Sequence, residues 1–213
     1  MRPVCACSVG LSLLLTGGLA LHLKARTAET PAQVYADPEA YKVYAAVLPI
    51  DSWYWESSNT MLILRDIPPR EWPIGGPRGA LRGNDTFKSE FEPIFQSFDE
   101  ANRVPMLLNS DLDLHRAHRF VTTAELDAAF AKGGRAQGGN GWEGFRQRFP
   151  NSTGYVILSV VGFNSDRTKA VVYVEHRCGN LCGEAHFYVL QKRDGLWVRY
   201  FPSDLESEMK GSS

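Results

Sequence analysis

The last third of the chain alternates β-forming runs with turn signals, and this pattern constrains the fold more than any other feature. The runs are GYVILSVVGF (154–163), KAVVYVEHR (169–177), EAHFYVLQKR (184–193) and LWVRYF (196–201), all rich in β-branched and aromatic residues. Asp194-Gly195 is the strongest hairpin signal, because a two-residue type I′ turn needs positive φ at both positions. We therefore predict an antiparallel β-meander.

Helical signals precede the meander. Asp37 and Pro38 suit the start of a helix that ends before Pro49. Thr122 and Glu125 form a capping box for a second helix. A third helical face spans 87–98, where Pro93 should kink or restart the helix, and the Pro- and Gly-rich segment 67–85 reads as a long loop after a short strand at 60–66.

Helices followed by a meander indicate the α+β class. We predict several short helices packed on one face of a C-terminal antiparallel β-meander, within a single domain over residues 37–206. Residues 26–36 are expected to be a linker, and residues 207–213 a disordered tail.

The N-terminal residues have the layout of an export signal. Arg2 precedes a Leu-rich centre, and small residues at Gly18 and Ala20 offer a cleavage site. We predict that residues 1–25 are a signal peptide. The alternative is an uncleaved inner-membrane anchor, because 4–23 matches the roughly 20 apolar residues that a spanning helix needs. Either way the protein is expected to be exported, to the periplasm or beyond the cell.

Cys178 and Cys182 are the cysteines that remain once Cys5 and Cys7 leave with the export segment. Two thiols at a hairpin tip can reach the Cα separation that a disulfide requires, and export leads to an oxidising compartment. We predict a Cys178–Cys182 disulfide. A redox pair is less consistent with this spacing, and a metal site that adds His176 and His186 is the other alternative.

The same region resembles a family of uncharacterised exported bacterial proteins. The matching features are a strand ending Gly-Phe-Asn (162–164), a Val-Tyr-Val strand (172–174), the Cys-Gly-x-x-Cys-Gly turn (178–183) and a final strand of Lys-x-x-Gly-x-Trp type (192–197). The likeness covers about the last third of the chain strongly. It implies export and a similar fold, and it implies no activity or catalytic residue.

The sequence contains little that supports a catalytic function. Gly139 to Gly144 fits the dinucleotide pattern, but a predicted helix rather than a strand comes before it, so we expect no nucleotide cofactor. In DLDLHRAHRF, Asp111 and Asp113 precede His115 and His118, and the default interpretation is surface histidines next to a short strand.

The predicted function is therefore a non-enzymatic binding or structural module, with an unknown protein or small-molecule partner and no cofactor. A formal net charge of −1 gives no reason to expect nucleic acid, and membrane contact is expected only through the N-terminal segment if it stays uncleaved. The alternative is a metal-dependent or other hydrolase with a site near the Cys178/Cys182 hairpin tip, using His176, His186 and the loop 67–85.

Overall fold

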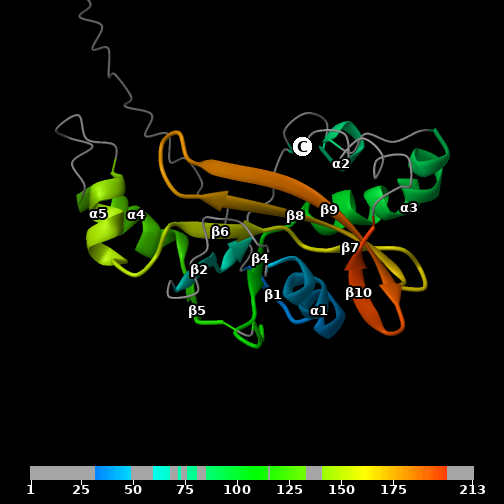
Figure 1. Ribbon diagram of the computed structural model, residues 1–213, viewed down its shortest axis with the longest axis horizontal. Helices are drawn as coiled ribbons and strands as arrows, with labels where there is room; N and C mark the ends of the chain where they lie inside the picture. Colours follow the sequence, from blue (N-terminus) through cyan, green and yellow to red (C-terminus); the bar gives the residue numbers. More distant parts are fainter. Residues whose placement is uncertain are drawn as a thin grey trace, which may run out of the picture. The chain divides into compact units, whose positions relative to one another are not determined.

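The computed structural model describes residues 32–48, 60–67, 72, 76–80, 85–114, 116–132 and 141–200 (Figure 1). Within them the helices are α1 (Pro38–Val47), α2 (Gly76–Ala80), α3 (Asp85–Ala101), α4 (Thr123–Lys132) and α5 (Trp142–Arg148). The strands are β1 (Gln33–Tyr35), β2 (Met61–Leu64), β3 (Asp66–Ile67), β4 (Met106–Leu108), β5 (His118–Val121), β6 (Tyr155–Leu158), β7 (Gly162–Phe163), β8 (Lys169–Arg177), β9 (Gly183–Arg193) and β10 (Leu196–Arg199). The predicted α+β class is confirmed.

The C-terminal strands form the predicted meander. β8 pairs antiparallel with β9 and β9 antiparallel with β10. The turn between β9 and β10 has φ of 50° at Asp194 and 81° at Gly195, as a type I′ turn requires. The hairpin signal read from this dipeptide is confirmed.

The sheet is mixed rather than antiparallel throughout. Its strand order is β10-β9-β8-β6-β2-β5, and both β6 and β5 run parallel to β2. The connections from β2 to β5 and from β5 to β6 both contain helices, which return the chain to the same end of the sheet and so allow parallel pairing. A smaller sheet, in the order β1-β4-β3, lies beside it.

The predicted strand 154–163 is divided into β6 and β7. Asn102, just after α3, supplies the reason, because its side chain takes over the backbone hydrogen bonds of Val160. Asn102 Nδ2 donates to the Val160 carbonyl at 3.0 Å, and the Val160 N–H donates to Asn102 Oδ1 at 2.8 Å. A side chain distant in the sequence thus replaces a neighbouring strand at this point.

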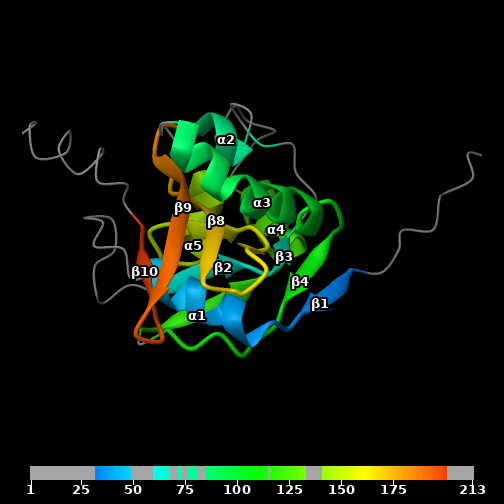
Figure 2. The ribbon, with the colours of Figure 1, turned by 90° about the vertical axis from the view of Figure 1, so that its right-hand side faces the viewer.

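Helices cover both faces of the large sheet, whereas we predicted one covered face (Figure 2). On β8, Ala170, Val172 and Val174 pack in one core cluster with α1. Val171 and Tyr173 point to the opposite face, where they join the phenylalanines of α3. α4 and α5 cover this second face farther along, over β2 and β6. Burial on both faces explains why β2 (MLIL) and β6 (YVIL) are apolar and buried at every position.

The long loop predicted at 67–85 contains the short helix α2. Its Arg78 binds two carboxylates of α3: Nε and NH2 lie 2.8–3.1 Å from the Glu92 carboxylate, and NH1 lies 2.5 Å from Asp99 Oδ2. These tertiary contacts, rather than local helix propensity, stabilise a helix in a Gly- and Pro-rich segment.

The predicted linker 26–36 also contains ordered structure. Gln33–Tyr35 form β1, which pairs in parallel with Met106–Leu108 of β4. The Tyr35 ring contacts the buried ring of Tyr44 on α1 at a centroid distance of 6.5 Å. The predicted segments 1–25 and 207–213 lie outside the described residues.

Local helix signals were read correctly. Asp37 Oδ1 accepts from the Glu39 N–H at 3.0 Å at the start of α1. In the capping box of α4, the Thr122 N–H donates to Glu125 Oε2 at 2.9 Å and the Glu125 N–H donates to Thr122 Oγ1 at 3.2 Å. The predicted restart at Pro93 is wrong, because Pro93 lies inside α3, which is one helix from Asp85 to Ala101.

Candidate functional site

The β8–β9 hairpin ends in the predicted disulfide. Cys178 and Cys182 are bonded, with their Cα atoms 5.1 Å apart. The Cys178 N–H also donates to the Cys182 carbonyl at 3.1 Å, so the tip is closed by both a covalent bond and a hydrogen bond. In this state neither sulfur is a thiolate that could bind a metal or act as a nucleophile.

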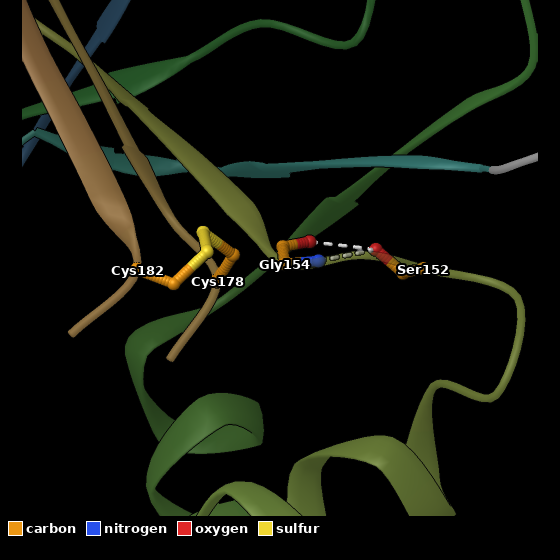
Figure 3. Close-up of a disulfide and its surroundings, with 4 residues drawn as sticks. All are labelled: Ser152, Gly154, Cys178 and Cys182. Atoms are coloured by element: carbon orange, nitrogen blue, oxygen red, sulfur yellow. Dashed lines mark hydrogen bonds between the residues drawn. A yellow bond between two sulfur atoms is a disulfide. The ribbon is translucent and has the colours of Figure 1, made fainter. Parts of the chain in front are cut away.

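The base of this tip rests on the turn that leads into β6 (Figure 3). Ser152 Oγ donates to the Gly154 carbonyl at 2.6 Å and shapes that turn. Gly154 has a φ of +152°, and a Cβ there would overlap the Arg177 carbonyl oxygen and lie 2.9 Å from Cys178 Cα. Only glycine allows the two backbones to come this close.

The two histidines proposed as a metal pair share a face of the hairpin but do not oppose each other. His176 lies opposite Glu184, and His186 lies opposite Val174. A hairpin centred on Leu181 would be needed to set residue 176 opposite residue 186. The Cys178–Cys182 pair instead centres it on Asn180, so the partners shift by two residues.

The surroundings of His176 favour its neutral form. The side chain is 3% exposed, and burial lowers its pKa, against a smaller opposing effect of Glu184. His186 is half exposed, with Nε2 at 3.5 Å from Glu184 Oε2. The cavity beside these residues measures about 10 Å³, which is room for about one water molecule.

The described part of the chain contains no group of three or more His, Cys, Asp or Glu side chains arranged to hold a metal ion. The metal-dependent hydrolase at the hairpin tip therefore remains a hypothesis supported only by the proximity of His176, Glu184 and His186. The loop at 67–85, which that hypothesis also used, is described only in part.

A larger cleft lies between α1 and the segment that follows β4. Its volume is about 310 Å³, at the lower end of the range of small-molecule sites. It is lined by Ala36, Pro38, Tyr41, Lys42, Ala45, Asn109, Asp111 and Asp113. One wall is thus aromatic and aliphatic, and the other carries amide and carboxylate groups.

Tyr41 is fixed in place by its hydroxyl group. The Asn109 N–H donates to this oxygen at 2.5 Å, and the hydroxyl lies within hydrogen-bonding distance of the carbonyls of Tyr35 (2.9 Å) and Asn109 (3.1 Å). Burial raises the Tyr41 pKa, and Asp111 raises it further, so the side chain stays neutral. A rigid, uncharged ring therefore forms part of the cleft wall.

The charge of the cleft is negative. Its lining carries two carboxylates, Asp111 and Asp113, and one ammonium group, Lys42, which lies 3.2 Å from Glu39 Oε2. Asp111 accepts from Asn109 Nδ2 at 2.7 Å, a neutral donor that leaves the carboxylate charge uncompensated. Asp111 and Asp113 are both exposed to solvent at the rim. This arrangement suits a positively charged group attached to a small apolar body.

Sequence reasoning did not predict this cleft. Asp111 and Asp113 were noted only as neighbours of two histidines, of which His115 lies outside the described residues and His118 lies on β5 as the strand interpretation required. The cleft depends on the pairing of β1 with β4, which brings the start of α1 next to Asn109, and no local pattern signals that pairing.

The chain matches no protein-family model, no curated protein and no solved structure. Across the ranges that the structure describes, no helix is both long and apolar enough to cross a membrane. The segment 4–23, considered above as an anchor, is outside these ranges.

Proposed function

We propose that this protein is an exported, non-enzymatic binding module that holds a small cationic ligand in the cleft between α1 and Asn109–Asp113. The cleft of about 310 Å³ is the observation that carries the proposal. This cleft combines ligand-sized space with the fixed ring of Tyr41 and the carboxylates of Asp111 and Asp113.

Export is supported by two independent features. Residues 1–25 have the layout of a signal peptide. The disulfide Cys178–Cys182 is the kind of bond that persists in the periplasm or outside the cell and is rare in the cytosol. The resemblance to uncharacterised exported bacterial proteins points the same way, and membership of that family is part of the proposal.

The cleft favours binding over catalysis because of what its walls contain. Tyr41 uses its hydroxyl group to hold the backbone, so this oxygen is not presented as an acid or base. Asp111 and Asp113 can attract an ammonium or guanidinium group, while Pro38, Ala45 and the Tyr41 ring can cover a short hydrocarbon chain.

Titration with n-butylammonium, followed by amide chemical shifts in ¹H–¹⁵N NMR spectra, tests this proposal. We expect saturable shifts centred on residues 41–45 and 109–113, with the millimolar affinity typical of a ligand of so few atoms. Butyrate, which has a similar chain length and the opposite charge, should give no such shifts.

Asp113→Asn should weaken n-butylammonium binding several-fold, because it removes one rim charge without changing the shape of the cleft. Asp127→Asn, at an exposed position of α4 on the opposite face of the large sheet from α1, is the matched control and should leave binding unchanged. Equal shifts with butyrate, or shifts that Asp113→Asn does not alter, would contradict the proposed ligand class.

A further inference from the structure

One edge of β9 is open in the part of the chain that the structure describes. β8 pairs with β9 from Gly183 to Gln191, whereas β10 pairs only with Leu190–Arg193. One further bond follows, from the Tyr200 N–H to the Val189 carbonyl at 2.8 Å. Figure 2 shows β10 beside only one end of β9. The segment from Gly183 to Tyr188 therefore has a described partner strand on one side only.

The register shows which backbone groups face this open edge. The Cys182 carbonyl accepts from Cys178, and the Lys192 N–H donates to Thr168, so even-numbered residues of β9 bond towards β8. Odd-numbered residues bond to the other side, as Val189 does. Gly183, Ala185 and Phe187 thus direct their N–H and C=O groups outward, along about 14 Å of strand.

The sequence that follows β10 is poorly suited to cover this edge. Arg199 lies opposite Leu190, so continuing the same register would set Pro202 opposite Phe187. Proline has no N–H to donate to the outward Phe187 carbonyl. The open stretch itself contains neither lysine nor proline, the residues that commonly protect a free edge from pairing with another chain.

We propose that the open edge of β9 pairs antiparallel with the same edge of a second copy of this chain, with Ala185 on the two-fold axis. This inference does not depend on the ligand proposed for the cleft. In this register Gly183 faces Phe187 of the second copy, and all three outward residues of each strand form backbone hydrogen bonds. The two large sheets become one continuous sheet across the dimer.

Side-chain chemistry is complementary in this register. Glu184 faces His186 of the second copy, and by symmetry His186 faces the second copy's Glu184. These contacts are two opposite-charge pairs when the histidines are protonated, and two hydrogen bonds from imidazole to carboxylate when the histidines are neutral. Ala185 is small enough to meet its own copy on the axis. The Phe187 ring packs against Trp72, Phe98 and Tyr173 of its own chain, and the second copy's Gly183 has no side chain to clash with it.

The two neighbouring registers are less favourable. Centring the pair on Glu184 would set two like charges against each other and leave Phe187 opposite Leu181 in the turn. Centring it on His186 would set Gly183 against Val189 of the second copy, whose carbonyl already accepts from Tyr200. The register centred on Ala185 alone uses every outward group.

Sedimentation equilibrium of the full chain, with Cys5 and Cys7 replaced by serine, tests this pairing. We expect a reversible monomer–dimer equilibrium. Glu184→Lys should weaken dimerisation about tenfold, because it replaces two favourable cross-strand pairs with two repulsive ones. The double variant Glu184→His, His186→Glu exchanges the two partners and should restore the dimer.

Ala185→Pro is a second test of the pairing. The Ala185 N–H points away from β8, so its loss leaves the hydrogen bonds between β8 and β9 intact. This variant should be monomeric and still show the unfolding transition of the parent chain. A monomeric parent chain would overturn the proposal, as would a dimer unaffected by Ala185→Pro or one that the exchanged pair fails to restore.

Discussion

Asn102 and Val160, 58 residues apart, exchange two hydrogen bonds that would otherwise belong to a neighbouring strand. Asn102 is 3% exposed, and its Nδ2 also donates to the Phe98 carbonyl at 2.8 Å. The Asn102 side chain thus binds the last turn of α3 and also supplies the hydrogen bonds that the backbone needs between β6 and β7.

Asn102→Ala should therefore lower the free energy of unfolding by about 2–4 kcal/mol, because it leaves both backbone groups of Val160 buried without a hydrogen bond. Urea unfolding followed by circular dichroism measures this change. Asn180→Ala at the exposed hairpin tip is the matched control, with a change within about 0.5 kcal/mol. Equal effects of the two substitutions would show that the hydrogen bonds between Asn102 and Val160 do not stabilise the break between β6 and β7.

Gly154→Ala should destabilise the protein by about 1–3 kcal/mol, because the new methyl group overlaps the Arg177 carbonyl and the backbone must shift. Gly179→Ala adds the same atom at a position where the nearest neighbour is Cys182 Cβ at 3.3 Å. Comparison of the two urea midpoints gives the result. A Gly154→Ala protein as stable as Gly179→Ala would mean that the turn and the hairpin base are not in contact.

Reducing the Cys178–Cys182 disulfide should cost about 2 kcal/mol, the chain-entropy value for so short a loop. The domain should stay folded, since the tip contributes no residue to the large core clusters. Unfolding curves with and without dithiothreitol measure the difference. The double variant Cys178→Ser, Cys182→Ser should match the reduced protein and show no response to reductant.

Glu39 should make the protein more stable near neutral pH than in acid. The Lys192 ammonium at 2.5 Å, helped by Trp197 Nε1 at 2.7 Å and by Lys42, lowers the pKa of Glu39 to about 2. Because the folded pKa lies below the ordinary value of 4.5, this contribution is complete above pH 4.5 and is lost as the pH falls towards 2.

Thermal unfolding of Glu39→Gln and the parent chain between pH 2 and 7 measures this dependence. The difference between them should be constant above about pH 5 and vanish near pH 2. Glu100→Gln on the exposed face of α3 is the control and should follow the parent curve. If the stability difference between Glu39→Gln and the parent chain grew as the pH fell, the pKa of Glu39 would not be lowered by folding.

Local signals in the sequence predicted the elements that depend on neighbouring residues. The Asp194-Gly195 turn, the Thr122–Glu125 capping box and the hairpin disulfide each need only a few adjacent positions, and all are present. The meander follows from such turns because short connections force consecutive strands to pair antiparallel.

Contacts between distant residues were not predictable in this way. The break at Val160 depends on Asn102, and helix α2 depends on the binding of Arg78 to α3. The cleft exists because β1 pairs with β4, about 70 residues later in the chain, and places Tyr41 beside Asn109. None of these pairs has a signal in its own segment, so the candidate ligand site could be found only from the fold.

Intact mass of the protein recovered from the envelope fraction of its host, before and after reduction and alkylation, tests the exported and oxidised state most directly. We predict a chain that begins near residue 21 or 26, or one that keeps the N-terminal segment and stays with the membrane. In either case Cys178 and Cys182 should be alkylated only after reduction. A full-length protein in the cytosol with both of these thiols free would contradict export and the closed hairpin tip together.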